Sequence, residues 1–220
     1  MVKEGECVNR ELVESLILIA AGYLAGSMLF GYFLPKYLKN MDIEQISEDH
    51  NPGTANVMKY AGIPLGLLCL FLDVMKGYLP LWCAARVVRP VSLAFAGIMA
   101  APVIGHAFPF WRNHRGGKAI AVTFGVLLGI RQFSPSIWVL AAIYIFLSVV
   151  LVVRPNERRS VYTFFLFGAV SAASLFFGGL PGICVGNILI AAVVINRNWA
   201  GACFGRTLQE EKRRIRNADS

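Results

Sequence analysis

Charged residues are scarce in this sequence: they fill only 15% of its 220 positions, whereas hydrophobic residues fill 56%. A soluble globular domain carries roughly 25% charged residues, so this chain is short of the side chains that a water-facing surface needs. The five cysteines are scattered without a C-x-x-C pair, and their spacing suggests neither a disulfide framework nor a zinc site. These deficits favour a bundle of membrane helices over a soluble domain.

Seven hydrophobic segments predict an all-α, polytopic integral membrane protein with about seven transmembrane helices. They lie at residues 12–34, 65–85, 91–111, 117–130, 137–153, 161–178 and 182–196. A spanning helix needs about 20 apolar residues, with a range of roughly 17–25, and the first three segments meet this length. Segment 117–130 is short, and only GGLP separates the last two segments, so half-spans or one bent helix pair stay open as alternatives. We find no internal repeat and predict a single domain over residues 1–220.

The placement of lysine and arginine predicts the orientation of the chain. With the N-terminus outside, the external segments hold five basic residues, namely Lys3, Arg10, Arg86, Arg89 and Arg131. The internal segments hold fifteen, and Lys76 lies within a span. This threefold excess follows the positive-inside rule and places the C-terminus in the cytoplasm. The acidic start of the chain argues against a signal peptide. We expect a multi-pass protein of the cell (plasma) membrane, with residues 204–220 as a basic cytoplasmic tail at its anionic inner leaflet.

The first of two unusual loops on the predicted cytoplasmic side covers residues 36–62 and contains HNPGTANV. Proline, glycine and asparagine favour tight turns, which can direct several N–H groups at one point and so form an anion nest. Asn51, Gly53, Thr54 and Asn56 are therefore candidate substrate ligands. The alternative is an ordinary turn in which Asn51 or Thr54 caps the following helix.

The second loop contains HRGGKA at residues 114–119 and leads directly into an apolar segment. Gly116 and Gly117 allow backbone amides to approach a ligand closely, and the helix that follows offers its free N–H groups and positive dipole end. Lys118 and Arg115 add positive charge at the same place. This pattern favours a phosphate site, although the P-loop pattern G-x-x-x-x-G-K-[ST] is absent. The alternative is that the basic residues only anchor the topology.

Two ionisable residues lie within the predicted second span, where Asp73 and Lys76 share one helical face. Such residues mark a functional interior or a pair that neutralises itself. His106, in GHAFPFW, lies at the cytoplasmic end of its span next to the second loop, and is the candidate catalytic base. A packed, hydrogen-bonded histidine is the alternative. Ser27 lies among small residues that favour close helix packing, and it is a candidate hydrogen-bond donor to a substrate.

These motifs, in this order, resemble the bacterial membrane glycerol-3-phosphate acyltransferases that use acyl phosphate as donor. The resemblance rests on AGS, NPGTANV, LDVMKGYLPLW, GHAFPFW and GGK followed by FG, and runs from about residue 22 to about residue 126. It implies a seven-span helical enzyme with its N-terminus outside and its motif loops in the cytoplasm. It also implies acyl transfer from acyl phosphate to the sn-1 hydroxyl of glycerol 3-phosphate, giving lysophosphatidic acid and phosphate without a metal or another cofactor.

The first family motif departs from its usual form in this sequence. The family reads Gly-Ser-Gly-Asn followed by Gly-Ala-Thr-Asn, whereas this chain reads EDHN and GTAN, so Asp49 stands where the family has a serine. Glu44 or Gln45 occupies the place of an upstream family arginine. Acids beside a phosphate site would repel the substrate unless they are turned away.

The later motifs match the family pattern more loosely. The second motif, usually Phe-Lys-Gly-Gly-Lys-Gly, is HRGGKA here, and Arg115 keeps the charge. A family serine in the fifth loop corresponds to Ser160, with an insertion. An asparagine and a glutamate near the C-terminus correspond to Asn196 or Asn198 and to Glu210.

The resemblance implies that Lys118 and the neighbouring glycine amides hold one phosphate and that the first loop holds the other. His106 or a substrate phosphate oxygen then accepts the hydroxyl proton. The expected partners are the two substrates and membrane lipid, with no nucleic acid and no obligate protein partner. The alternatives are a divergent paralogue with another acceptor or no turnover, and a transporter of small anions or lipid phosphates.

Overall fold

The computed structural model describes residues 2–112 and 116–218, with side chains for 11–112, 116–199, 202 and 203. Within these ranges the chain is helical and contains no strand, which confirms the all-α class. The α-helices are α1 (Val2–Ser27), α2 (Phe30–Lys39), α3 (Ile43–Ile46), α4 (Thr54–Ala61), α5 (Ile63–Ala84), α6 (Leu93–Ala107), α7 (Ile120–Gly129), α8 (Ser136–Ile145), α9 (Asn156–Ser174) and α10 (Pro181–Ala218). Short helical turns follow at Phe110–Arg112, Phe146–Val150 and Leu175–Phe177.

Helix length and composition account for the predicted spans. Four helical stretches are long and apolar enough to cross a membrane, namely Ile63–Ala84, Leu93–Arg112, Asn156–Phe177 and Pro181–Trp199. A fifth is the pair Glu11–Ser27 and Phe30–Lys39, which is bent by 41°. Two shorter apolar helices, Ile120–Gly129 and Ser136–Val150, coincide with the remaining predicted segments. The structure therefore supports four or five spans, and the count of seven and the orientation of the termini stay predictions.

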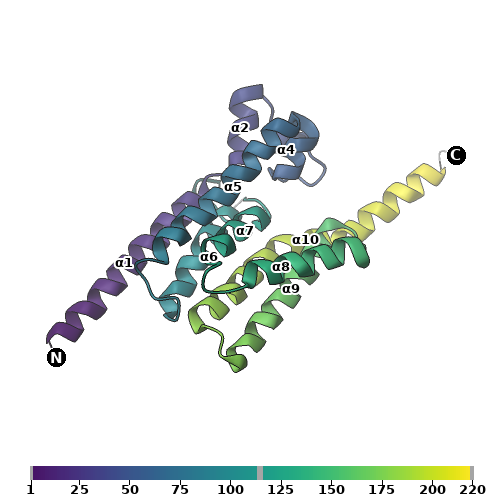
Figure 1. Ribbon diagram of the computed structural model, residues 1–220. Coiled ribbons are helices and arrows are strands. Elements are labelled where there is room, and N and C mark those ends of the chain that lie inside the picture. Colours follow the sequence, from purple (N-terminus) through teal and green to yellow (C-terminus); the bar gives the residue numbers. More distant parts are fainter. Residues whose placement is uncertain (1, 113–115, 219–220) are drawn as a thin grey trace.

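Helix α6 lies in the centre of the bundle and packs against α1, α5, α7 and α10 (Figure 1). This helix carries the fully buried side chains of Phe95, Ile98, Met99 and Val103. Nearly all of its remaining residues are also apolar. A helix that is apolar on all sides is suited to a membrane span or to a protein core, and the contacts of α6 place it in the core. The α6 stretch is 67% buried, whereas the stretches that contain α5 and α9 are each 33% buried and leave faces open to the surroundings.

Small residues set the close approach of α1 and α6. A Cβ atom on Gly26 would overlap the backbone of Pro102, and a Cβ atom on Gly22 would press against its ring. Small residues at helix contacts bring backbones together where no hydrophobic force separates helix from lipid. The structure thus confirms the packing interpretation of the small residues in the first span.

The segment 36–62, which was predicted to be one long polar loop, is largely helical in the structure, and this corrects the prediction. The segment contains the end of α2 and the whole of α3 and α4. The side chain of Asp42 caps α3 by accepting hydrogen bonds from the amides of Glu44 and Gln45. The N-cap of α4 is Gly53, which has no side chain, so neither Asn51 nor Thr54 fills the capping role considered for it. Local capping and a short apolar cluster around Ile43 make these helices stable despite their polar sequence.

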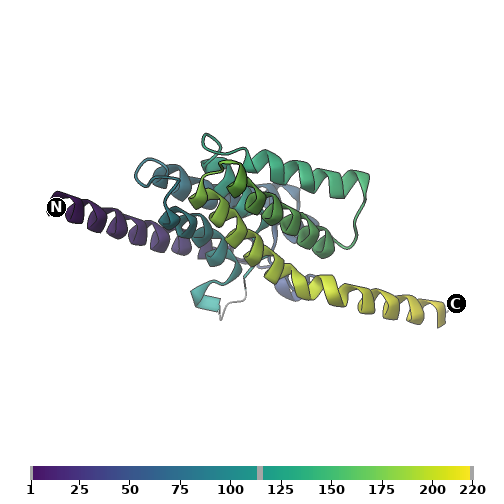
Figure 2. The same ribbon diagram turned by 90° about the horizontal axis from the view of Figure 1, so that it is seen from below.

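The two terminal helices extend beyond the bundle in opposite directions (Figures 1 and 2). Helix α10 continues without a break from the core to Ala218. The segment predicted as a tail, 204–220, therefore continues the last helix as far as Ala218. Its cytoplasmic location stays a prediction.

Candidate active site

Three segments that the sequence places on one side of the membrane meet around a cavity of about 430 Å³. They are the first loop with the start of α4, the glycine loop with the start of α7, and the start of α9. Helices α5, α6, α8 and α10 complete the wall with Leu70, Asp73, His106, Tyr144 and Asn198. Segments more than a hundred residues apart in the sequence thus build one site.

Three helix N-termini open into this cavity. Thr54 and Ala55 begin α4, Ile120 and Ala121 begin α7, and Asn156 begins α9, and all of them line the cavity. The first N–H groups of a helix have no partner within the helix, and the helix dipole adds positive potential there. One such terminus favours an anion, and three around one cavity favour a ligand with several negative oxygens.

Lys118 bridges the cavity between two carboxylates. Its Nζ lies 2.7 Å from Asp49 Oδ2 and 2.6 Å from Glu157 Oε1. Burial alone would raise the pKa of Asp49, but the hydrogen bonds from Lys118 and Asn56 lower it below its ordinary value. Burial would likewise lower the pKa of Lys118, but its two carboxylate partners raise it. Asp49 and Lys118 therefore both carry charge near neutral pH, and a ligand phosphate must compete with the Asp49 and Glu157 side chains for Lys118.

Asn56 fixes the shape of the first loop. Its side-chain amide donates to Asp49 Oδ1 at 2.7 Å and to the carbonyl oxygen of Asn51 at 2.8 Å. These two bonds tie the start of α4 back onto the loop that precedes it. The acid at position 49 is therefore held toward the cavity, and is not turned away from it.

A buried polar cluster lies beneath the cavity floor. Lys76 Nζ lies 2.7 Å from Asp73 Oδ1 and 2.7 Å from His106 Nδ1, and it donates to the carbonyl oxygen of Met28 at 2.6 Å. An ammonium group only donates, so His106 Nδ1 accepts, and the neutral ring carries its proton on Nε2. Asp73 and His106 line the cavity, and Lys76 orients both from behind.

The glycine pair packs directly against α6. The amide of Gly117 donates to the carbonyl oxygen of His106 at 3.0 Å, and a Cβ atom on Gly117 would overlap His106 Nε2. A Cβ atom on Gly116 would overlap the backbone of His106 and Ala107. Arg197 of α10 donates to the carbonyl oxygens of both glycines. The glycines are thus required for close approach of two backbones, and this packing brings Lys118 to the cavity.

Helices α8 and α9 form another part of the cavity wall. The guanidinium of Arg159 lies 5.4 Å from the centre of the Tyr144 ring, and its Nη2 donates to Asn156 Oδ1 at 2.8 Å. The hydroxyl groups of Ser160 and Tyr144 lie 3.2 Å apart. Phe124 packs edge-on against Tyr144, with ring centres 6.5 Å apart. This side of the cavity therefore combines two aromatic rings, the hydroxyl groups of Ser160 and Tyr144, and one cation.

A family model described as glycerol-3-phosphate acyltransferase matches residues 16–202. The chain belongs to this family. The match extends well beyond the motif resemblance and includes α8, α9 and most of the described part of α10. The comparison confirms the family predicted from the motifs, and the chain is an integral membrane protein of the acyltransferase family.

Individual relatives give the same result. The glycerol-3-phosphate acyltransferase of Myxococcus xanthus (strain DK1622) is 35% identical over 144 residues, which are 66% of this chain and 72% of that protein. That of Anaeromyxobacter sp. (strain Fw109-5) is 36% identical over 121 residues, which span only 59% of its own length. The crystal structure of PlsY (YgiH), an integral membrane glycerol 3-phosphate acyltransferase in its glycerol 3-phosphate form, superposes with a TM-score of 0.74. It is 27% identical and covers 88% of this chain and 92% of its own.

Most of the predicted site residues of this family member lie around the one cavity. Those that line it are Asn51, Gly53, Thr54, Asn56, Asp73, His106, Lys118, Ser160 and Asn198. Lys76 and Gly117 lie directly behind it. Gly116 lines a neighbouring hollow, whose other lining residues include Glu44, Arg112 and Arg197. Arg115 lies outside the described residues. Their roles toward substrates stay predictions.

Ser27 is not brought to the cavity. Its hydroxyl donates to the carbonyl oxygen of Tyr23 at 2.8 Å, one turn back along α1, and its own carbonyl oxygen accepts from Trp111. The residue is buried where α1 contacts α6. Its small side chain therefore fits the contact between α1 and α6, away from the residues that line the cavity, and its role toward a substrate stays a prediction.

Several cavity residues were missed by the sequence reasoning. Glu157, Arg159 and Tyr144 carried no motif, although the polar stretch NERRS after a proline marks the start of α9. Glu44, one of the two residues that could stand at the place of the family arginine, pairs bidentately with Arg112 in the neighbouring hollow. An arginine from another segment therefore lies beside the position that lost one.

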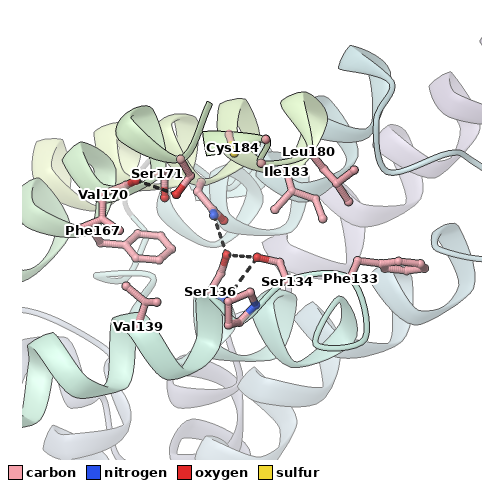
Figure 3. A pocket seen from close by; sticks show the side chains of 15 residues that line it. Phe133, Ser134, Ser136, Val139, Phe167, Val170, Ser171, Leu180, Ile183 and Cys184 are labelled. Carbon is pink, nitrogen blue, oxygen red and sulfur yellow. Dashed lines mark hydrogen bonds between the residues drawn. The ribbon is translucent and has the colours of Figure 1, made fainter. Parts of the chain in front are cut away.

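A second cavity, of about 200 Å³, lies near the connection between α9 and α10, and Figure 3 shows the side chains that line it. It is enclosed by the start of α8, the end of α9 and the start of α10, and its lining includes Ser134, Ser136, Phe167 and Ile183. No charged side chain is among its lining residues. This cavity therefore offers a phosphate no cation, which distinguishes it from the cavity around Lys118.

Proposed function

We propose that this chain transfers a fatty acyl group from acyl phosphate to the sn-1 hydroxyl of glycerol 3-phosphate, giving lysophosphatidic acid and phosphate. Its relatives are named for acyl transfer to glycerol 3-phosphate, and solved PlsY neighbours are in glycerol 3-phosphate and lysophosphatidic acid forms. The observation that carries the proposal is the convergence of three helix N-termini and Lys118 on one cavity with an apolar wall. Such a cavity suits two phosphate-bearing substrates, one of which has a long acyl chain.

In the proposed reaction, the sn-1 oxygen attacks the acyl carbonyl carbon and the bond from that carbon to the phosphate oxygen breaks. Acyl phosphate is an activated mixed anhydride, so the site must mainly align the hydroxyl with the carbonyl and balance the negative charge. Lys118 and the N-terminus of α7 hold the glycerol 3-phosphate. The released inorganic phosphate leaves with the electron pair of the broken bond.

The hydrogen bonds of His106 indicate whether its ring can accept the proton of the sn-1 hydroxyl. Because Nδ1 accepts from Lys76, the neutral ring presents Nε2–H, which is a donor and not a base. We therefore assign the hydroxyl proton to a phosphate oxygen of the substrate, and we assign His106 a hydrogen-bond donor role instead of that of the base. No cofactor takes part in this scheme. The motif loops would face the cytoplasm, where glycerol 3-phosphate is soluble.

A second candidate is the same fold with a different acceptor. The two carboxylates on Lys118, one of them at a family serine position, favour it because they oppose a dianionic phosphate. Transport of a small anion has less support, since paired repeats are typical of such transporters and the sequence shows none.

The deciding experiment supplies purified, detergent-solubilised protein with labelled glycerol 3-phosphate and either palmitoyl phosphate or palmitoyl-CoA. We expect lysophosphatidic acid from the phosphate donor only. Product from the CoA donor would contradict the proposed donor. Binding of palmitoyl phosphate without product from glycerol 3-phosphate would favour the second candidate.

A further inference from the structure

If the proposed function holds, the cavity must neutralise two phosphate groups. Of its two cations, one is already paired with carboxylates and the other is not. Among the described residues that line it, Lys118 and Arg159 carry positive charge, and Asp49, Asp73 and Glu157 carry negative charge. Lys118 already contacts two of these carboxylates. A single lysine so compensated is a poor partner for both substrates, so the second phosphate needs another cation.

Arg159 has N–H donors that are not used in hydrogen bonds within the described part of the chain. Its only side-chain hydrogen bond among the described residues runs from Nη2 to the side chain of Asn156, at 2.8 Å. Its Nε is buried and has no hydrogen-bond partner in the described part of the chain. An unpaired buried donor is costly, and a ligand oxygen that accepts from it removes the cost. The planar guanidinium suits two phosphate oxygens at once.

Aromatic and apolar side chains surround Arg159, as a phosphate attached to an acyl chain would require. Its guanidinium lies over the Tyr144 ring, and Phe124 continues the aromatic wall beyond it. Leu70 and Ile120 add further apolar lining. A ligand with its phosphate at Arg159 can therefore lay an acyl chain along these side chains, whereas Lys118 lies beside the polar loop at Asp49 and Asn56.

We propose that Arg159 binds the phosphate group of the acyl phosphate, while Lys118 binds that of glycerol 3-phosphate. This assignment rests on the proposed function for the identity of the substrates. It gives each phosphate its own cation and leaves the acyl carbonyl between them. Ser160, whose hydroxyl lies next to Tyr144, is placed to hydrogen-bond the same phosphate.

The test measures equilibrium binding of dodecyl phosphate, a non-reacting alkyl phosphate, to the full-length solubilised protein. Arg159→Gln removes the charge, and Arg158→Gln is the matched control because Arg158 donates to the carbonyl oxygen of Ala202 and does not line the cavity. We expect Arg159→Gln to weaken binding about tenfold or more, a size typical of a lost charge-assisted phosphate contact. Arg158→Gln should bind like the wild type. Dodecanol, which has the chain without the phosphate, should bind all three proteins alike.

Kinetics then separate the two phosphates. Arg159→Gln should raise the KM for palmitoyl phosphate and leave that for glycerol 3-phosphate within about twofold, and Arg159→Lys, which keeps the charge, should restore part of the loss. Equal affinity of wild type and Arg159→Gln for dodecyl phosphate would overturn the inference, as would a rise confined to the KM for glycerol 3-phosphate. If Arg159→Gln binds dodecyl phosphate more weakly than the wild type does, but the wild type forms no lysophosphatidic acid, the inference stands and the proposed function is contradicted.

Discussion

Replacing Asp49 by asparagine should improve the affinity for glycerol 3-phosphate. Asp49 Oδ2 lies 2.7 Å from Lys118 Nζ, so a phosphate oxygen bound to the same nitrogen would lie about 4–5 Å from the carboxylate. Two unit charges 5 Å apart interact by about 3 kcal/mol at an effective dielectric constant near 20. The Asp49 side chain is 36% exposed, and screening reduces this to about 1 kcal/mol, or a factor of about five in KM.

The assay is the steady-state rate of lysophosphatidic acid formation at fixed palmitoyl phosphate and varied glycerol 3-phosphate. Asparagine keeps the oxygen that accepts from Asn56, so the loop should hold its shape. Glu48→Gln is the matched control, since Glu48 is an exposed neighbouring acid paired with Lys59 and does not line the cavity. The reasoning is refuted if Asp49→Asn leaves the KM unchanged or raises it, or if the control lowers it equally.

Two further predictions concern stability in detergent. Asp73→Asn leaves the buried ammonium of Lys76 without its carboxylate partner and should lower the free energy of unfolding by about 3–5 kcal/mol. Adding Lys76→Met to this variant should recover part of the loss. Equal stability of Asp73→Asn and wild type would contradict this prediction. The pKa of Asp49 is held below 3.8 despite burial, and that of Lys118 above 10.5, because the groups are paired. Their stabilisation is present between these values, is lost as pH falls through the native pKa of Asp49, and is also lost as pH rises through that of Lys118. The difference in Tm between wild type and Asp49→Asn should therefore stay constant from about pH 5 to 9 and shrink below about pH 4.

The positions of the helices and much of the cavity follow from local sequence signals. Hydrophobic runs located each apolar helix, and the three-residue spacing of Asp73 and Lys76 correctly placed them on one face as an ion pair. The motif loops were predicted to share one side of the membrane, and they do meet around one cavity. Such signals depend on spacing within a single helix or on the alternation of spans.

Contacts between distant segments could not be predicted in this way. The sequence gives no indication that Glu157 would reach Lys118 from α9, or that Ser27 would turn back to its own helix at the contact with α6. The glycine loop was interpreted as a ligand cradle, whereas its amide and carbonyl groups bind His106 and Arg197. Lys118 and the glycine loop have their partners in other helices, and Ser27 lies where α1 packs against α6. These contacts depend on how distant helices pack, which local sequence patterns do not specify.

The central claim is that acyl transfer takes place at the cavity around Lys118. The most direct measurement compares lysophosphatidic acid formation from palmitoyl phosphate by wild type, Lys118→Ala and Lys59→Ala, where Lys59 is an exposed lysine outside the cavity. We predict that Lys118→Ala loses nearly all activity, that it raises the KM for glycerol 3-phosphate in whatever activity persists, and that Lys59→Ala retains wild-type rates. A folded Lys118→Ala protein with unchanged kcat and KM would contradict the account.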